Sequence, residues 1–126
     1  MTYKFKVPNI PPSSNKMYSI NHYNRLVYLT PEARHFKTCV KLACPTMKFS
    51  CEKPRLSIEI AYYSPKWLCK NGNIRKIDGQ NCDKAIYDAI AESIGIDDSF
   101  FWKWQGIKVL SQEEYTEIEV SEILNV

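Results

Sequence analysis

Four stretches of the chain alternate apolar and polar residues, as β-strands do when one face lies in a core. They cover residues 3–9, 55–63, 100–110 and 114–123. A shorter extended apolar run spans residues 26–29, after a polar loop. Gly106 interrupts the third alternating stretch, and we expect a β-bulge near it because a glycine inside a strand often marks one.

Two other stretches repeat apolar residues at helical spacing. Thr30 and Pro31 are typical of a helix start, so the first helix is expected over residues 31–43. The second helix is expected over residues 81–94, with Gly95 as its C-terminal stop. The positions expected to face the core are Ala33, Phe36, Cys39, Val40 and Ala43 in the first helix, and Cys82, Ile86, Ala89, Ile90 and Ser93 in the second.

The order of these elements predicts an α/β fold. We expect a single small domain over residues 1–126, with a mixed β-sheet of about four to five strands packed by two helices. The five cysteines form no CxxC pair, which argues against a disulfide framework or a zinc site. The sequence has no signal-like segment and no apolar run of membrane-spanning length, so we expect a soluble cytoplasmic protein in a reducing compartment, with no membrane partner.

Two loops have both a structural and a functional interpretation. Pro11 and Pro12 fix a loop that continues through Asn15 and Lys16, whose side chains are suited to contact phosphate or to form a turn. In the loop over residues 64–75, Trp67 lies among basic residues and would either stack on a nucleobase or pack over the sheet edge.

Positive charge is concentrated before residue 77 and negative charge after it. The net charge is only +3, but the first 63 residues carry ten Lys and Arg against three acids. Residues 66–76 add four cations and no acid. Solvated surface charge accounts for many of these residues, and a polyanion partner such as DNA would account for a cluster. The candidate DNA-binding residues are Asn15, Lys16, Arg34, Lys37, Arg75 and Lys76.

The stretch over residues 76–99 collects the residues with the chemistry of phosphate hydrolysis. Asp78 precedes the second helix, Lys84 lies on it, and Asp97 and Asp98 follow it. Carboxylates are the ligands that Mg²⁺ prefers, and a lysine can neutralise charge on a phosphate. The same residues also suit a helix cap, a surface ion pair and a solvated turn, and spacing alone does not choose.

The combination of motifs resembles the RusA-type Holliday-junction resolvases. The pattern D-x-D-N-x-x-K of that family is matched by Asp78-Gly79-Gln80-Asn81-x-x-Lys84, followed by Asp88-Ala89-Ile90 and the Asp97-Asp98 pair. The loop Pro11-Pro12-Ser13-Ser14-Asn15-Lys16-x-Tyr18 and the helix start Leu29-Thr30-Pro31-Glu32-Ala33-Arg34 also resemble the family. The resemblance spans nearly the whole chain in order.

This resemblance implies a homodimeric, Mg²⁺-dependent endodeoxyribonuclease, with Mn²⁺ as a substitute, that resolves four-way DNA junctions in recombination and repair. Asp78 and Asp98 would be metal-ligating and catalytic, Lys84 the catalytic lysine, and Asn81 its polar partner at the helix start. Gln80 replaces a family aspartate. A glutamine oxygen can ligate Mg²⁺ but brings no negative charge. Either a neighbouring carboxylate (Asp97, Asp83 or Asp88) supplies the missing charge, or the activity is weakened or lost.

A helix over residues 81–94 rises roughly 20 Å, so it separates Asp78 from Asp98 within one chain. We therefore expect the site to be completed across a two-fold axis, with Asp78 of one subunit near Asp98 of its partner. Two alternatives remain at this point. The first is a catalytically impaired binder of branched or single-stranded DNA with the same fold, and the second is a protein-interaction module that uses the aromatic residues.

Overall fold

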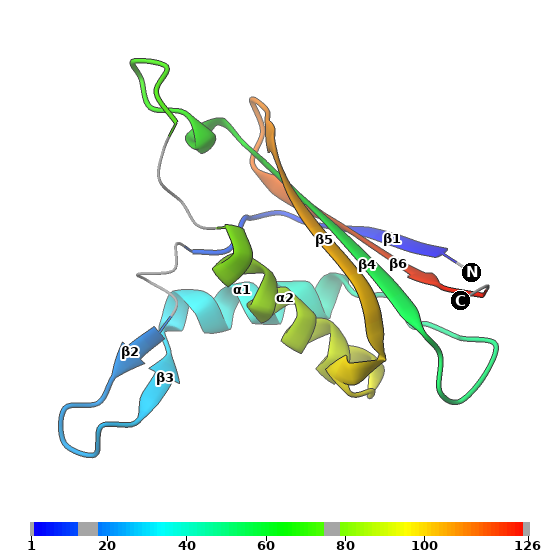
Figure 1. Ribbon diagram of the computed structural model, residues 1–126. Helices are drawn as coiled ribbons and strands as arrows, with labels where there is room; N and C mark the ends of the chain where they lie inside the picture. Colours follow the sequence, from blue (N-terminus) through cyan, green and yellow to red (C-terminus); the bar gives the residue numbers. More distant parts are fainter. Residues whose placement is uncertain (1, 13–17, 75–78, 125–126) are drawn as a thin grey trace.

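The structure, a computed structural model, describes residues 2–12, 18–74 and 79–124 (Figure 1). The main sheet has four strands, β1 (Thr2–Val7), β4 (Leu56–Ser64), β5 (Phe101–Leu110) and β6 (Tyr115–Glu122), in the order β1-β6-β4-β5. β4 and β5 are parallel, whereas the other neighbours are antiparallel. The helices α1 (Pro31–Ala43) and α2 (Gly79–Ile94) cover one face of this sheet (Figure 1). The predicted α/β fold with a mixed sheet and two helices is confirmed.

Helix α1 has the predicted bounds. Thr30 caps it, because its Oγ1 accepts a hydrogen bond from the amide of Ala33 at 3.3 Å. Ala33, Phe36 and Val40 are buried, as their spacing predicts. Together with β4, β6 and α2, they enclose the core between the helices and the sheet.

Helix α2 begins at Gly79, two residues earlier than predicted. Its buried side chains are Ala85, Ile86, Ala89, Ile90 and Ala91. Ser93, predicted for the core, is exposed, because its hydroxyl is satisfied near the helix surface by the carbonyl of Ala89 at 2.7 Å. The side chain of Cys82 lies outside the described residues.

The two-stranded sheet of β2 (Tyr18–Ile20) and β3 (Val27–Leu29) was predicted only in part. The sequence pattern indicated loops around a short extended run, but these residues form an antiparallel hairpin. β3 lies within the extended run predicted at residues 26–29, whereas β2 and the pairing of the two strands were not predicted, because a three-residue strand is too short for an alternating pattern.

The bulge expected near Gly106 is in the wrong place. The register between β4 and β5 shifts between Leu56 and Ser57, whose partners are Phe101 and Lys103, so Trp102 is the extra residue. Gly106 itself pairs regularly with Ile60. The reason for a glycine at this position is a close side-chain contact, described below.

Trp67 packs into the protein, which confirms the structural interpretation of its loop. It lies in a 3₁₀ turn, Pro65–Trp67, and its ring is buried in the core. Its Nε1 donates a hydrogen bond to the carbonyl of Tyr62 at 2.9 Å. The ring is therefore unavailable for stacking on a base.

The crossover from β4 to β5 positions the candidate site. Because β4 and β5 are parallel, α2 runs back along them, from the end of β4 to the start of β5 (Figure 1). The beginning of α2 therefore lies toward the C-terminal end of β4, and the end of α2 lies toward the N-terminal end of β5. No helix in the described ranges has the length and apolar character to cross a membrane.

Candidate active site

Asp97 and Asp98 lie in the turn between α2 and β5. Asp97 caps a short 3₁₀ helix, Asp98–Phe100, and its Oδ1 accepts a hydrogen bond from the amide of Ser99 at 2.8 Å. Both carboxylates are exposed, and Asp88 joins them in lining one shallow hollow at the end of α2. The predicted Asp pair is thus ordered by its own turn and faces solvent.

The charges in this turn act on one another. The pKa of Asp98 is raised, first by its hydrogen bond with the Asp97 side chain and further by the negative charges of Asp97 and Asp88. The pKa of Asp97 is lowered, chiefly by the Ser99 amide. Anions that crowd each other in this way would be stabilised by a cation placed between them.

Lys84 lies on α2 toward its beginning, and its side chain is exposed. Ten residues of helix separate it from Ile94, which is about 15 Å along the helix axis. Asp98 lies beyond Ile94, in the turn whose hollow is lined by the last turns of α2. Five predicted site residues, Asn15, Lys16, Arg75, Lys76 and Asp78, lie outside the described residues, as do the side chains of Gln80 and Asn81.

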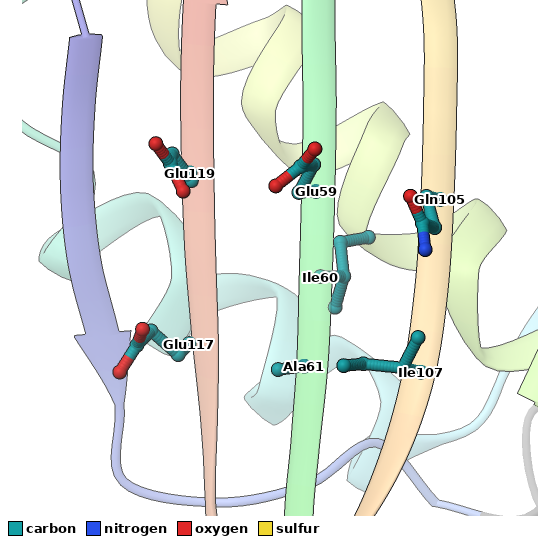
Figure 2. Close-up of a pocket in the computed structure, with 7 residues that line it drawn as sticks. All are labelled: Glu59, Ile60, Ala61, Gln105, Ile107, Glu117 and Glu119. Carbon is teal, nitrogen blue, oxygen red and sulfur yellow. The ribbon is translucent and has the colours of Figure 1, made fainter.

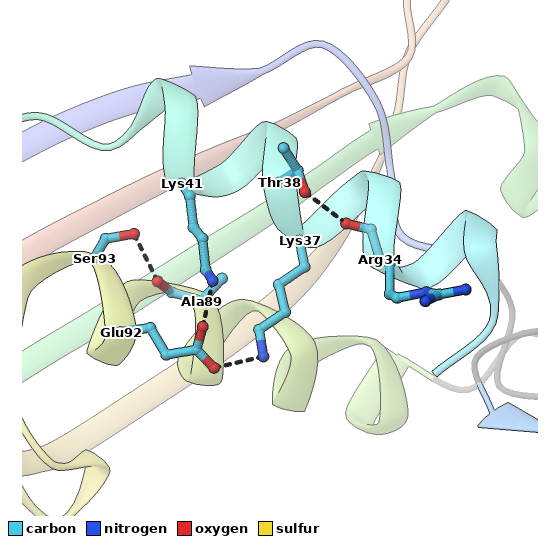
Figure 3. A network of polar contacts seen from close by, with 7 residues as sticks. All are labelled: Arg34, Lys37, Thr38, Lys41, Ala89, Glu92 and Ser93. Carbon is cyan, nitrogen blue, oxygen red and sulfur yellow. Dashed lines mark hydrogen bonds and ion pairs between the residues drawn. The ribbon is translucent and has the colours of Figure 1, made fainter. Parts of the chain in front are cut away.

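Lys37 already has a partner within the chain. Its amine donates to Glu92 Oε1 of α2 at 2.6 Å, and Lys41 forms an ion pair with the other oxygen of the same carboxylate (Figure 3). Glu92 thus joins the two helices and has a lowered pKa, owing first to its hydrogen bonds with the two lysines. Arg34 is exposed one turn earlier and makes no ion pair within the part of α1 and its surroundings that is described.

Asp83, on the first turns of α2, has a structural role that was not predicted from the sequence. The hydroxyl of Tyr62 on β4 donates a hydrogen bond to its Oδ1. A Cβ at Gly106 on β5 would lie 2.7 Å from Oδ2, which explains the glycine. The hydroxyl of Tyr87 is buried nearby, and its pKa is raised by that burial and by the charge of Asp83. The glycine inside a strand was the available signal, but it indicated a close approach instead of a bulge.

The face of the sheet that the helices leave uncovered carries charges of both signs. Figure 2 shows Glu59, Glu117 and Glu119 on this face, around a pocket that is also lined by Gln105 and Ile107. Lys4 neutralises one of them through an ion pair with Glu117 at 2.9 Å. The pairing register places Lys4, Lys6 and Lys103 on the same face, so three lysines balance its three glutamates.

A divalent metal would need several oxygen ligands. Within residues 2–12, 18–74 and 79–124, no group of three or more His, Cys, Asp or Glu is arranged to hold a metal ion. Asp97 and Asp98 have the right ligand chemistry for Mg²⁺, but among the described residues they are an incomplete set.

Comparison with known proteins supplies the identity of the fold. No curated protein matches the chain. The family model of endodeoxyribonuclease RusA matches residues 9–121, which include both helices, most of the main sheet and the Asp97–Asp98 turn. The chain therefore belongs to the RusA family of endodeoxyribonucleases, the Holliday-junction resolvases that its sequence resembles.

Proposed function

We propose that this chain is a divalent-metal-dependent endonuclease that resolves four-way or other branched DNA by phosphodiester hydrolysis, as a homodimer, in recombination and repair. The observation that carries the proposal is the RusA match over residues 9–121. The exposed cations Arg34 on α1 and Lys84 on α2 support it, because both side chains can reach a phosphate backbone from the helices.

In this proposal Asp98 and Asp97 hold the metal together with Asp78, and Gln80 is a weak ligand. A bound Mg²⁺ or Mn²⁺ would supply an acidified water and charge neutralisation at the phosphate. The grouping of Asp97 and Asp98 with Asp88 around one exposed hollow supports a role for this pair, because carboxylate oxygens are the ligands that Mg²⁺ prefers.

Lys84 stabilises the negative charge that develops on the phosphate. Asn81 is its polar partner at the start of α2. Arg34 contacts the DNA backbone, with Asn15, Lys16, Arg75 and Lys76 as further contacts. Lys37 would take part only by exchanging its ion pair with Glu92 for a phosphate. Because such contacts are to the backbone, binding is salt-dependent and reads DNA shape.

The site is shared between subunits in this proposal. Lys84 lies about 15 Å before the end of α2 along its axis, and Asp98 lies in the turn that follows the helix. A two-fold axis that places the Lys84 end of one helix beside the Asp98 end of its partner creates two equivalent sites. Two sites suit paired cuts in a two-fold symmetric junction.

A second candidate function is junction binding without cleavage. It is favoured by Gln80, which stands where the family pattern has an aspartate and removes one negative charge from the ligand set.

A cleavage assay separates the two functions. The protein is incubated with a synthetic four-way junction and with a linear duplex of the same arms, in Mg²⁺, Mn²⁺ or EDTA. The proposal expects junction cleavage that depends on metal, and loss of cleavage with retained binding for Asp98→Asn. Binding without cleavage in either metal supports the second function, in which case Gln80→Asp tests whether one charge restores activity. Absence of any junction binding contradicts both.

A further inference from the structure

The β2–β3 hairpin extends away from the rest of the fold (Figure 1). Its two strands pair only with each other in the described sheets. Its base is fixed by Leu29, which packs against Ala33 of α1 and Ala85 of α2. Ala85 follows Lys84 in the chain, so the hairpin projects from the end of α2 that carries the proposed catalytic lysine.

The tip of the hairpin is held in one conformation. Asn21 Oδ1 accepts a hydrogen bond from the amide of Tyr23 at 2.9 Å, and Asn24 Oδ1 accepts one from the amide of Leu26 at 3.0 Å. The amide of Arg25 donates to the carbonyl of Asn21 at 2.7 Å. Tyr23 is fully exposed on this ordered tip. A preorganised side chain loses less conformational entropy when it binds.

Arg25 occupies an unusual backbone conformation. Its φ is +57°, in the left-handed region that favours glycine or asparagine. It is the one non-glycine residue with a positive φ in the described ranges. An arginine that keeps this conformation points to a use for its charge beyond the turn.

The chemistry of the tip is complementary to DNA. Residues 18–31 contain no acid, and the tip presents His22, Tyr23 and Arg25. An exposed aromatic ring can stack on any base, and an adjacent arginine can neutralise a phosphate.

We infer that this hairpin is a DNA-binding arm that engages the branch point, with Tyr23 stacked on a base exposed there and Arg25 on a neighbouring phosphate. The inference rests on the proposed action on branched DNA and assigns it a recognition element. The ring gains most where a base is already unstacked, so the arm favours branched DNA over a continuous duplex.

The test measures binding in EDTA, where no cleavage occurs, by fluorescence anisotropy of a four-way junction and of a linear duplex. The junction carries 2-aminopurine at the branch point as a stacking probe. Tyr23→Ala is expected to weaken junction binding about tenfold and duplex binding far less, whereas Tyr23→Phe keeps both. Wild type and Tyr23→Phe should quench 2-aminopurine, and Tyr23→Ala should not.

Arg25→Asn separates charge from turn geometry. Asparagine tolerates a positive φ, so the variant should fold at least as stably as wild type while it binds the junction more weakly and with a smaller salt dependence. Leu42→Ala, which removes an exposed apolar side chain from α1, is the matched control and should bind as wild type.

If wild type binds the junction, either of two results with the Tyr23→Ala variant overturns the inference. One is unchanged junction affinity and quenching in Tyr23→Ala. The other is a change in oligomeric state of Tyr23→Ala by light scattering, which would assign the arm to a second copy of the chain, covering Ile20 and Val27. If wild type binds no junction at all, the proposed function itself fails, which is a distinguishable outcome.

Discussion

The carboxylate of Asp83 on α2 lies against the backbone of Gly106 on β5, leaving no room for a side chain there. A Cβ at position 106 would meet both carboxylate oxygens, at 2.7 and 2.8 Å. The Tyr62 hydroxyl holds the same carboxylate from β4. These contacts fix the beginning of α2 over the parallel strand pair and thereby set the position of Lys84, the next residue.

Gly106→Ala should therefore destabilise the protein. The new methyl group forces Asp83 out of its position, and overpacking of this kind costs about 1–3 kcal/mol. Urea denaturation followed by circular dichroism should show the lower midpoint with an unchanged slope.

The matched control combines Gly106→Ala with Asp83→Ala. Removing the carboxylate makes room for the methyl group, so the double variant should be more stable than the sum of the two single effects predicts. Additive effects would contradict a direct clash between the two positions.

Glu92 gives the protein a small stability term that depends on pH. Because its pKa is lowered in the folded state by Lys37 and Lys41, the unfolded chain binds the proton more tightly. The contribution is complete above the ordinary value of 4.5 and disappears as the pH falls through the lowered pKa. Glu92→Gln should cost less than about 1 kcal/mol at pH 7, because the carboxylate is half-exposed, and nothing in strong acid.

Thermal melts of wild type and Glu92→Gln between pH 2 and 7 measure this difference. Glu113→Gln, which changes an exposed glutamate without an ion pair within the described chain, is the control. A difference in melting temperature between wild type and Glu92→Gln that stays the same at all pH values would rule out this link between the pKa of Glu92 and stability.

The features that were predicted correctly from the sequence are those that local signals determine. The start of α1 at Pro31 carried a capping threonine and a first-turn proline, and the helix has the predicted bounds. The family motif likewise located Asp97 and Asp98 in their turn. These features depend on neighbours within a few residues.

Tertiary partners explain what the sequence could not predict. Gly106 was correctly recognised as unusual. The side chain that requires a glycine there belongs to Asp83, which lies 23 positions earlier in the chain. The helical spacing predicted a core face for the second helix, but it held no information on the ion pair between Glu92 and Lys37 of the first helix. The pairing of β2 with β3 was missed because β2 has only three residues, too few for an alternating pattern.

The charge coupling in the Asp97–Asp98 turn can be tested directly. Asp97→Asn removes one negative charge and provides an amide donor, so the pKa of Asp98 should fall. Asp88→Asn should lower it too, but less, because Asp88 acts only through its charge. Carboxyl carbon NMR titrations of the three proteins measure these values, and an unchanged Asp98 in Asp97→Asn would contradict the coupling.

A mixed-subunit experiment tests the shared site. Lys84→Ala and Asp98→Asn are each expected to abolish cleavage in a homodimer. If a site combines Lys84 of one subunit with Asp98 of its partner, a heterodimer of the two variants contains one intact site and one that lacks both residues. Two affinity tags on co-expressed chains allow this heterodimer to be purified. It should nick one strand of a four-way junction, where wild type makes paired cuts. A heterodimer that binds the junction as wild type does and leaves it uncut would place the complete site within one chain, and would require Lys84 and Asp98 to act at different phosphates.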